Sequence, residues 1–287
     1  YLAEEKDVIL CSFGDMIRVP GSKKSILEAK AQGADIRILY SPLEAVNIAK
    51  ANPDKEVVFF AVGFETTAPA NALSVLHAEK LGLSNYSILT SHVLVPPAIE
   101  NVMEDVDSHI DGFLAAGHVC SIMGYWEYYP LAEKFKVPIV VTGFEPLDIL
   151  QGILMTVKQL EKNKYEVENQ YSRAVTEEGN EAAQDIIAKI FEVTDRVWRG
   201  MENIPMSGFA VKESYAAFDA IRKFDVTISE AEENQSCLAG DIMKGIIKPH
   251  QCPEFGKKCN PQNPLGAPMV SSEGACAAYY HFSDILA

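Results

Sequence analysis

The sequence lacks any hydrophobic run long enough to cross a membrane. A transmembrane helix needs about 20 consecutive apolar residues, whereas the longest apolar runs here, such as residues 57–62 and 137–141, have the length of β-strands. The acidic, polar start of the chain also lacks the charged and apolar regions of a signal peptide. These absences argue against a membrane or secreted protein and favour a cytoplasmic one.

Positive charge is also scarce. The chain has 25 Lys and Arg against 40 Asp and Glu, which gives a net charge of −15. Nucleic acids and anionic membranes attract basic surfaces, so neither is expected as a partner. The sequence contains no G-x-G-x-x-G after its first strand and no G-x4-G-K-[ST]. Hydride transfer and phosphate-driven chemistry are therefore disfavoured.

The sequence does contain an alternation of strand-like and helix-like segments. Continuous apolar strands of this kind are typical of parallel sheets with helices on both faces. Ser22 is the expected N-cap of the first helix. The pattern predicts two Rossmann-like α/β domains. The expected strands are residues 8–13, 35–40, 56–62, 86–89, 112–116 and 137–142, and the expected helices are residues 22–32, 42–51, 67–81, 95–104, 125–135 and 146–162.

Composition changes along the second half of the chain. Residues 165–199 are polar and are predicted to be helical, with one helix at residues 180–193. Beyond Cys237 the chain is rich in Pro, Gly, Asn and Cys. Such a stretch cannot build a hydrophobic core unaided, so its folding requires a cross-link such as a bound metal. We expect a first α/β domain over residues 1–85, incomplete at its N-terminus. A second α/β domain with a helical extension is expected over residues 86–200, and a C-terminal iron–sulfur cluster domain over residues 201–287.

Four of the six cysteines lie close to the C-terminus, with the spacing C-x14-C-x6-C-x16-C. This is neither a zinc ribbon nor the short run of a ferredoxin. Clustering in a chain without a signal peptide favours a reducing compartment and a metal. The spacing is compatible with a [4Fe–4S] cluster or a structural zinc ion. The alternatives without a metal are four reduced thiols or two disulfides. The four are Cys237, Cys252, Cys259 and Cys276.

Polar side chains also follow several of the expected strands. Asp15 and Arg18 follow the first strand, Glu65 follows the third, and His118 follows the fifth. Ligands of open α/β sheets bind at the carboxyl ends of strands, so these four are candidate catalytic residues. Each also has a structural alternative. In these alternatives Asp15 caps a turn and Arg18 forms an ion pair with it, whereas Glu65 begins a helix and His118 is a core histidine. The repeat of Gly-Phe-Glu at residues 63–65 and 143–145 predicts equivalent loops that face one cleft.

Several longer motifs resemble the HypD hydrogenase maturation proteins. They are CSFGDMIRVPG at residues 11–21, GFETTAP at 63–69, GFLAAGH at 112–118 and TGFEPLDIL at 142–150. The tail continues the resemblance with GDIMKG at residues 240–245, PHQCPEFG at 249–256 and GAPMVSSEGAC at 266–276. The resemblance therefore covers essentially the whole chain, in order.

This resemblance implies a role in [NiFe]-hydrogenase assembly rather than conventional small-molecule catalysis. HypD proteins act with a HypC-type chaperone as the scaffold on which a transient iron acquires two cyanides and one carbon monoxide, with cyanide supplied by a HypE-type partner. The resemblance also implies a [4Fe–4S] cluster on the four C-terminal cysteines and places Asp15 near the iron-assembly site. Electrons for ligand conversion would come from that cluster.

The sequence departs from the family in one respect. HypD proteins carry an upstream Cys-Gly-Gly-His-Thr-His motif, which supplies the iron-binding thiol, and a Gly-Pro-Gly-Cys-Pro-Val-Cys motif, which supplies a redox dithiol. Neither is present here. This chain is expected to keep cluster binding and to lack the main iron-site thiol. The alternatives are a non-catalytic scaffold with a purely structural cluster and a small-molecule enzyme that uses the cleft between the two lobes.

Overall fold

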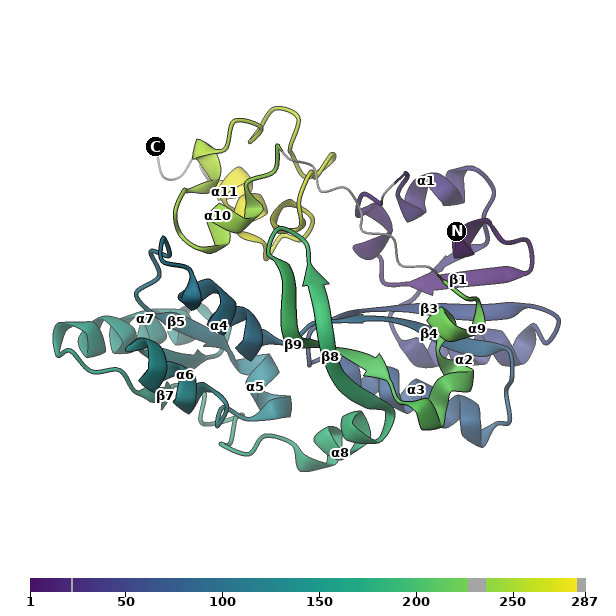
Figure 1. Cartoon of the computed structure of the whole chain (residues 1–287), viewed down its shortest axis with the longest axis horizontal. Helices are drawn as coiled ribbons and strands as arrows, with labels where there is room; N and C mark the ends of the chain where they lie inside the picture. Colours follow the sequence, from purple (N-terminus) through teal and green to yellow (C-terminus); the bar gives the residue numbers. More distant parts are fainter. Residues whose placement is uncertain (22, 227–235, 283–287) are drawn as a thin grey trace.

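The structure is a computed structural model that describes residues 1–21, 23–226 and 236–282 (Figure 1). Two parallel α/β units lie on either side of an antiparallel hairpin, and the C-terminal unit lies at one end of that hairpin. The prediction of an α/β fold with parallel sheets is confirmed. No helix in the described residues is both long and apolar enough to span a bilayer.

The first sheet has four parallel strands in the order β2-β1-β3-β4. Val, Ile, Leu and Phe are the most frequent of its buried residues, as expected for a sheet covered on both faces. β4 pairs with β3, so the expected domain boundary at residue 85 falls between two paired strands. The strands are β1 (Val8–Ser12), β2 (Ile36–Ile38), β3 (Glu56–Gly63) and β4 (Tyr86–His92), and the helices are α1 (Ile26–Ala31), α2 (Pro42–Ala51) and α3 (Ala68–Lys80).

Capping boxes define where the first two helices begin. The hydroxyl of Ser25 accepts from the Glu28 N–H while the Glu28 carboxylate accepts from the Ser25 N–H, which satisfies two unpaired donors of α1. α2 starts with Pro42 after a second capping box. Ser22, the expected cap of the first helix, lies outside the described residues.

The second sheet has three parallel strands in the order β5-β6-β7. The expected helices do not include residues 117–123, but these residues form α5 directly after β5. Gly124, whose φ is +76°, ends that helix without the strain that a side chain would meet in this conformation. The strands are β5 (Phe113–Ala116), β6 (Ile139–Thr142) and β7 (Val167–Asn169), and the helices are α4 (Val95–Glu104), α5 (Gly117–Met123), α6 (Tyr128–Phe135) and α7 (Pro146–Glu161).

An antiparallel hairpin was not predicted. The region expected to be helical contains α8 (Glu181–Ile190), but the chain then turns into β8 (Phe191–Trp198) and β9 (Glu202–Val211). The Leu94 N–H donates to the Ser207 carbonyl at 2.8 Å, which joins β9 to the segment between β4 and α4. The hairpin thus runs between the two α/β units, and its tip reaches the C-terminal unit (Figure 1).

The C-terminal unit consists of short helices and loops, as its Pro- and Gly-rich composition predicts. Lys244 pairs with Asp105 at 2.6 Å and so ties this unit to the second α/β unit. A small buried cluster is surrounded by the short helices α10 (Ala239–Met243), η4 (Pro249–Gln251), η5 (Ala267–Met269) and α11 (Ala275–Phe282). The other short helices lie near the first sheet. They are η1 (Leu2–Glu4), η2 (Met16–Arg18), η3 (Glu213–Phe218) and α9 (Ala220–Lys223).

Candidate functional site

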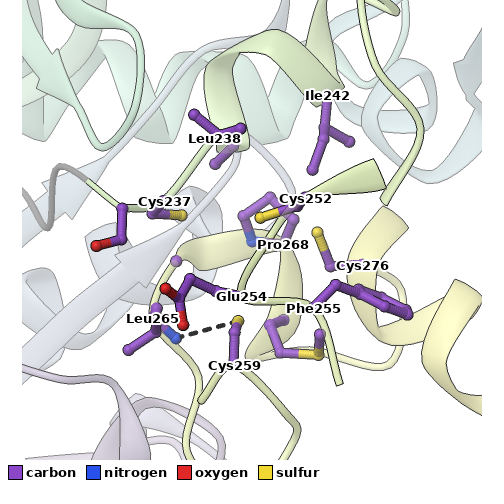
Figure 2. A pocket seen from close by; sticks show the side chains of 14 residues that line it. Cys237, Leu238, Ile242, Cys252, Glu254, Phe255, Cys259, Leu265, Pro268 and Cys276 are labelled. Atoms are coloured by element: carbon purple, nitrogen blue, oxygen red, sulfur yellow. Dashed lines mark hydrogen bonds between the residues drawn. The ribbon is translucent and has the colours of Figure 1, made fainter. Parts of the chain in front are cut away.

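The four C-terminal cysteines line one pocket, although they come from four different segments (Figure 2). Cys237 precedes α10, Cys252 follows η4, Cys259 lies in the next loop, and Cys276 is in the first turn of α11. The loop of Cys259 is closed on itself by a bridge to Phe255 and by a hydrogen bond from the Cys259 N–H to the Glu254 carbonyl at 3.0 Å. Local turns therefore bring the thiols together without a regular sheet.

Apolar side chains make up most of the rest of the wall, and the pocket has an empty volume of about 330 Å³ including its opening to solvent. Cys259 and Cys276 are each only 8% exposed and belong to the buried cluster of this unit. Such a wall keeps water away from the sulfur atoms. The apolar residues are Leu238, Ala239, Ile242, Phe255, Leu265, Pro268 and Met269.

Burial raises the pKa of the Cys237 thiol, while a hydrogen bond from the Ala239 backbone and the nearby charge of Arg199 act in the opposite direction. Burial, together with the other three thiols, raises the pKa of Cys276 to about 12. The Leu265 N–H donates to the Cys259 sulfur at 3.5 Å. Because at least two of the thiols are protonated at neutral pH, a metal that binds here must displace their protons.

The donor set fits a multi-iron cluster. All six cysteines are free, so the alternative of two disulfides does not describe this structure. In the described ranges, no three His, Cys, Asp or Glu side chains come close enough together to hold one metal ion. The sulfurs surround the pocket instead of converging on a point (Figure 2). Four thiols from separate segments around one pocket are a donor set that a cluster with one thiolate for each iron corner can use.

Gly266 leaves room for the sulfur of Cys237. A Cβ atom at position 266 would lie 2.3 Å from that sulfur, so the Cys237 side chain would have to rotate out of the pocket. We expect Gly266→Ala to lower iron content after anaerobic reconstitution while the far-ultraviolet circular dichroism stays unchanged. Ala267→Ser, at the neighbouring exposed position, is the matched control. Full iron content in Gly266→Ala would contradict this role for Gly266.

The four strand-end candidates occupy different environments. Asp15 and Arg18 are exposed at the carboxyl end of β1, where the Asp15 carboxylate accepts from the Met16 N–H at 3.0 Å and caps η2. Glu65 is 2% exposed, and His118 is exposed at the start of α5 with its ring 4.8 Å from that of Phe144. No side-chain hydrogen bond or ion pair among the described residues joins any two of the four candidates.

The two Gly-Phe-Glu segments are not equivalent, contrary to the sequence-based expectation. Glu65 is buried, and its Oε1 accepts from the Val95 N–H at the start of α4 at 2.8 Å. Burial raises the pKa of Glu65 to about 7. Glu145 is exposed and lies 3.6 Å from the guanidinium of Arg173. Only the first segment therefore contributes a buried carboxyl group.

Sequence reasoning did not identify Leu265, Gly266 and Arg199 as neighbours of the cysteines. Gly266 is the first residue of the motif GAPMVSSEGAC, but the motif alone does not show that this glycine lies against a cysteine sulfur. His92, the last residue of β4, is fully buried, and burial lowers its pKa to about 3. Its Nε2 lies 2.8 Å from the Asn71 side-chain amide, so it is a neutral core histidine.

The chain is similar to several known proteins along almost its whole length. The family model described as "Hydrogenase formation hypA family" (HypD) matches residues 1–283. Hydrogenase maturation factor HypD2 of Bradyrhizobium diazoefficiens is 48% identical over 98% of this chain and 76% of its own length. Hydrogenase maturation factor HypD of Rhizobium leguminosarum bv. viciae is 47% identical over 98% and 75%. The Escherichia coli protein of that name is 45% identical over 98% and 76%.

Proposed function

The chain belongs to the HypD family of hydrogenase maturation factors, and on this basis we propose that it is a redox-active iron–sulfur scaffold for [NiFe]-hydrogenase assembly. In this proposal it works in the reducing cytoplasm with a HypC-type chaperone and a HypE-type cyanide donor. The product is an iron that carries two cyanides and one carbon monoxide. The observation that supports the proposal is the gathering of four thiols from separate segments around one apolar pocket.

We propose that the cysteines at positions 237, 252, 259 and 276 hold a [4Fe–4S] cluster. When bound, the cluster supplies electrons one at a time for the reductive steps of ligand assembly. The apolar wall limits the contact of the sulfur atoms with water. The N–H groups of Ala239 and Leu265 point to the sulfurs of Cys237 and Cys259 and stabilise negative charge there.

The iron that receives the ligands is cargo, and we propose that it meets the strand-end residues. Asp15 and Arg18 lie exposed on one loop, so they are free to contact an incoming iron or a partner that carries it. His118 is exposed at the end of a strand of the second sheet. Glu65 is buried, and we assign it the role of holding a proton and anchoring the start of α4.

Metal analysis of protein purified without oxygen tests the proposal. We expect a brown protein with about four irons per chain and an electron paramagnetic resonance signal that appears on reduction. We also expect infrared bands of iron-bound cyanide to appear on the complex with the chaperone and the cyanide donor, and only after the cluster has been reduced. A colourless protein with one zinc per chain would rule the proposal out.

A non-catalytic scaffold whose cluster is purely structural is the second candidate. The observation that favours it is that two of the cysteines belong to the only buried cluster found among the described residues of the C-terminal unit. Under this alternative, ligand loading would be equal for the oxidised and the reduced protein. Removal of the cluster would instead increase proteolysis of the C-terminal unit.

A further inference from the structure

The tip of the β8–β9 hairpin lies directly against the segment that carries Cys237. The chain turns at Gly200, where φ is +86°. A Cβ atom at position 240 would lie 2.4 Å from the Gly200 carbonyl oxygen, so the two backbones are in close contact. Met201 packs with Val102 of α4 in the same small cluster. The tip is therefore held between α10 and the second α/β unit.

Arg199, at this tip, reaches two sites at once. Its guanidinium donates from Nη1 to the Pro20 carbonyl at 2.9 Å, which lies in the loop that follows Asp15 and Arg18. Arg199 and Cys237 also line one small pocket together with Gly266. The side chain thus spans from the strand-end loop of the first sheet to a wall of the cysteine pocket.

No acidic side chain among the described residues balances the charge of Arg199. Within the described ranges, no carboxylate forms an ion pair with Arg199, and its only side-chain hydrogen bond goes to the Pro20 carbonyl. The side chain is half-buried, so water screens its charge only in part.

We propose that Arg199 is a positioning residue that tunes the iron–sulfur cluster and fixes the Asp15 loop beside it. This inference rests on the proposed function, because it requires a cluster on Cys237. A thiolate-bound cluster becomes more negative by one charge when it takes up one electron, and a nearby cation stabilises that form more than the oxidised one. Arg199 therefore raises the reduction potential, and its bond to Pro20 holds the loop of Asp15 at a fixed place.

The test compares Arg199→Gln, Arg199→Lys and the control Arg222→Gln in the full chain, reconstituted with iron and sulfide under anaerobic conditions. Arg222 pairs with Glu213 and with Asp219 on the first α/β unit, and it lines neither the cysteine pocket nor the small pocket that Arg199 shares with Cys237. Two properties are measured. The first is the midpoint potential from a dye-mediated titration followed by electron paramagnetic resonance, and the second is the rate of tryptic cleavage after Arg18.

We expect Arg199→Gln to keep about four irons per chain, to shift the potential to more negative values and to speed cleavage after Arg18. Arg199→Lys keeps the charge and should stay close to the wild-type potential, and Arg222→Gln should match the wild type in both measurements. If Arg199→Gln fails to hold iron, a cluster at the wild-type potential in Arg199→Lys supports the role of charge, whereas loss in both variants overturns it.

An unchanged potential and an unchanged cleavage rate in Arg199→Gln, with the cluster present, overturn the inference and leave the proposed function standing. A wild-type protein that binds no iron overturns both. The two failures are therefore told apart by the iron content of the unsubstituted chain.

Discussion

Cys259→Ala is expected to reduce the iron content from about four atoms per chain to near zero. Cys259 is 8% exposed, its loop is closed by the bridge to Phe255, and its sulfur accepts from the Leu265 N–H. The substitution removes one of only four thiols that line the pocket. Iron and sulfide analysis after anaerobic reconstitution measures the effect. Limited proteolysis should show faster cleavage of the C-terminal unit, because a bound metal contributes folding free energy.

Cys120→Ala is the matched control, because it removes a second buried thiol from a different part of the fold. Cys120 belongs to the core of the second α/β unit, where its sulfur lies 4.0 Å from the Tyr128 hydroxyl. Burial raises the pKa of this thiol to about 12, which makes it an inert core residue and not a metal ligand. Iron content should stay at the wild-type level. Loss of iron in Cys120→Ala but not in Cys259→Ala would refute the ligand assignment.

The two α/β units could be predicted from the sequence because their local signals agree with their tertiary surroundings. The strand of residues 56–62 is apolar after Glu56, with one face fully buried and the other half-buried to buried. The helix of residues 42–51 starts with proline and a capping box, and it begins and ends at the expected residues. In such segments burial, propensity and capping favour one structure, so single-sequence reasoning is sufficient.

The β8–β9 hairpin could not be predicted because, on β8, valines lie on the exposed face and polar side chains lie on the half-buried face. On β8 the half-buried positions include Thr194 and Arg196, whereas Val193 and Val197 are 42% and 62% exposed. A register irregularity between Thr194 and Arg196 interrupts the alternation further. The usual pattern of apolar residues on the inner face is therefore absent. The hairpin is held by neighbouring segments such as the one after β4, where Val93 bridges Gly208 of β9, and the sequence does not place that segment beside it.

The candidate site was predictable in its residues but not in its geometry. The clustering of cysteines indicated a metal, yet the spacing along the chain could not choose between iron–sulfur and zinc. That choice depends on how far apart the sulfurs lie, which is set by turns such as the one at Gly266 and by the packing of α10 and α11. The two Gly-Phe-Glu segments illustrate the same limit. Identical residues differ because one glutamate faces the start of α4 and the other faces solvent.

Glu65 is expected to make the protein less stable as the pH rises from about 4.5 to about 7. Its ordinary pKa is 4.5, and burial raises the pKa to about 7 in the folded chain, with a smaller contribution from Glu127. Between these values the folded state holds a proton that the unfolded state has lost, so the free energy of unfolding falls as the pH rises. The shift corresponds to a loss on the order of 3 kcal/mol. Above pH 7 this loss is complete.

Glu65→Gln should remove this dependence because the amide resembles the protonated acid. Its oxygen can still accept from the Val95 N–H, and its other atom occupies the place of Oε2, which has no hydrogen-bond partner among the described residues. Urea unfolding at pH 5 and pH 8 measures the effect. The variant should match the wild type at pH 5 and exceed it at pH 8 by up to about 3 kcal/mol. Glu145→Gln, in the exposed copy of the motif, should follow the wild type at both pH values. Equal behaviour of the two variants would mean that Glu65 is already ionised in the folded protein and is not the proton-holding group that we assign to this loop.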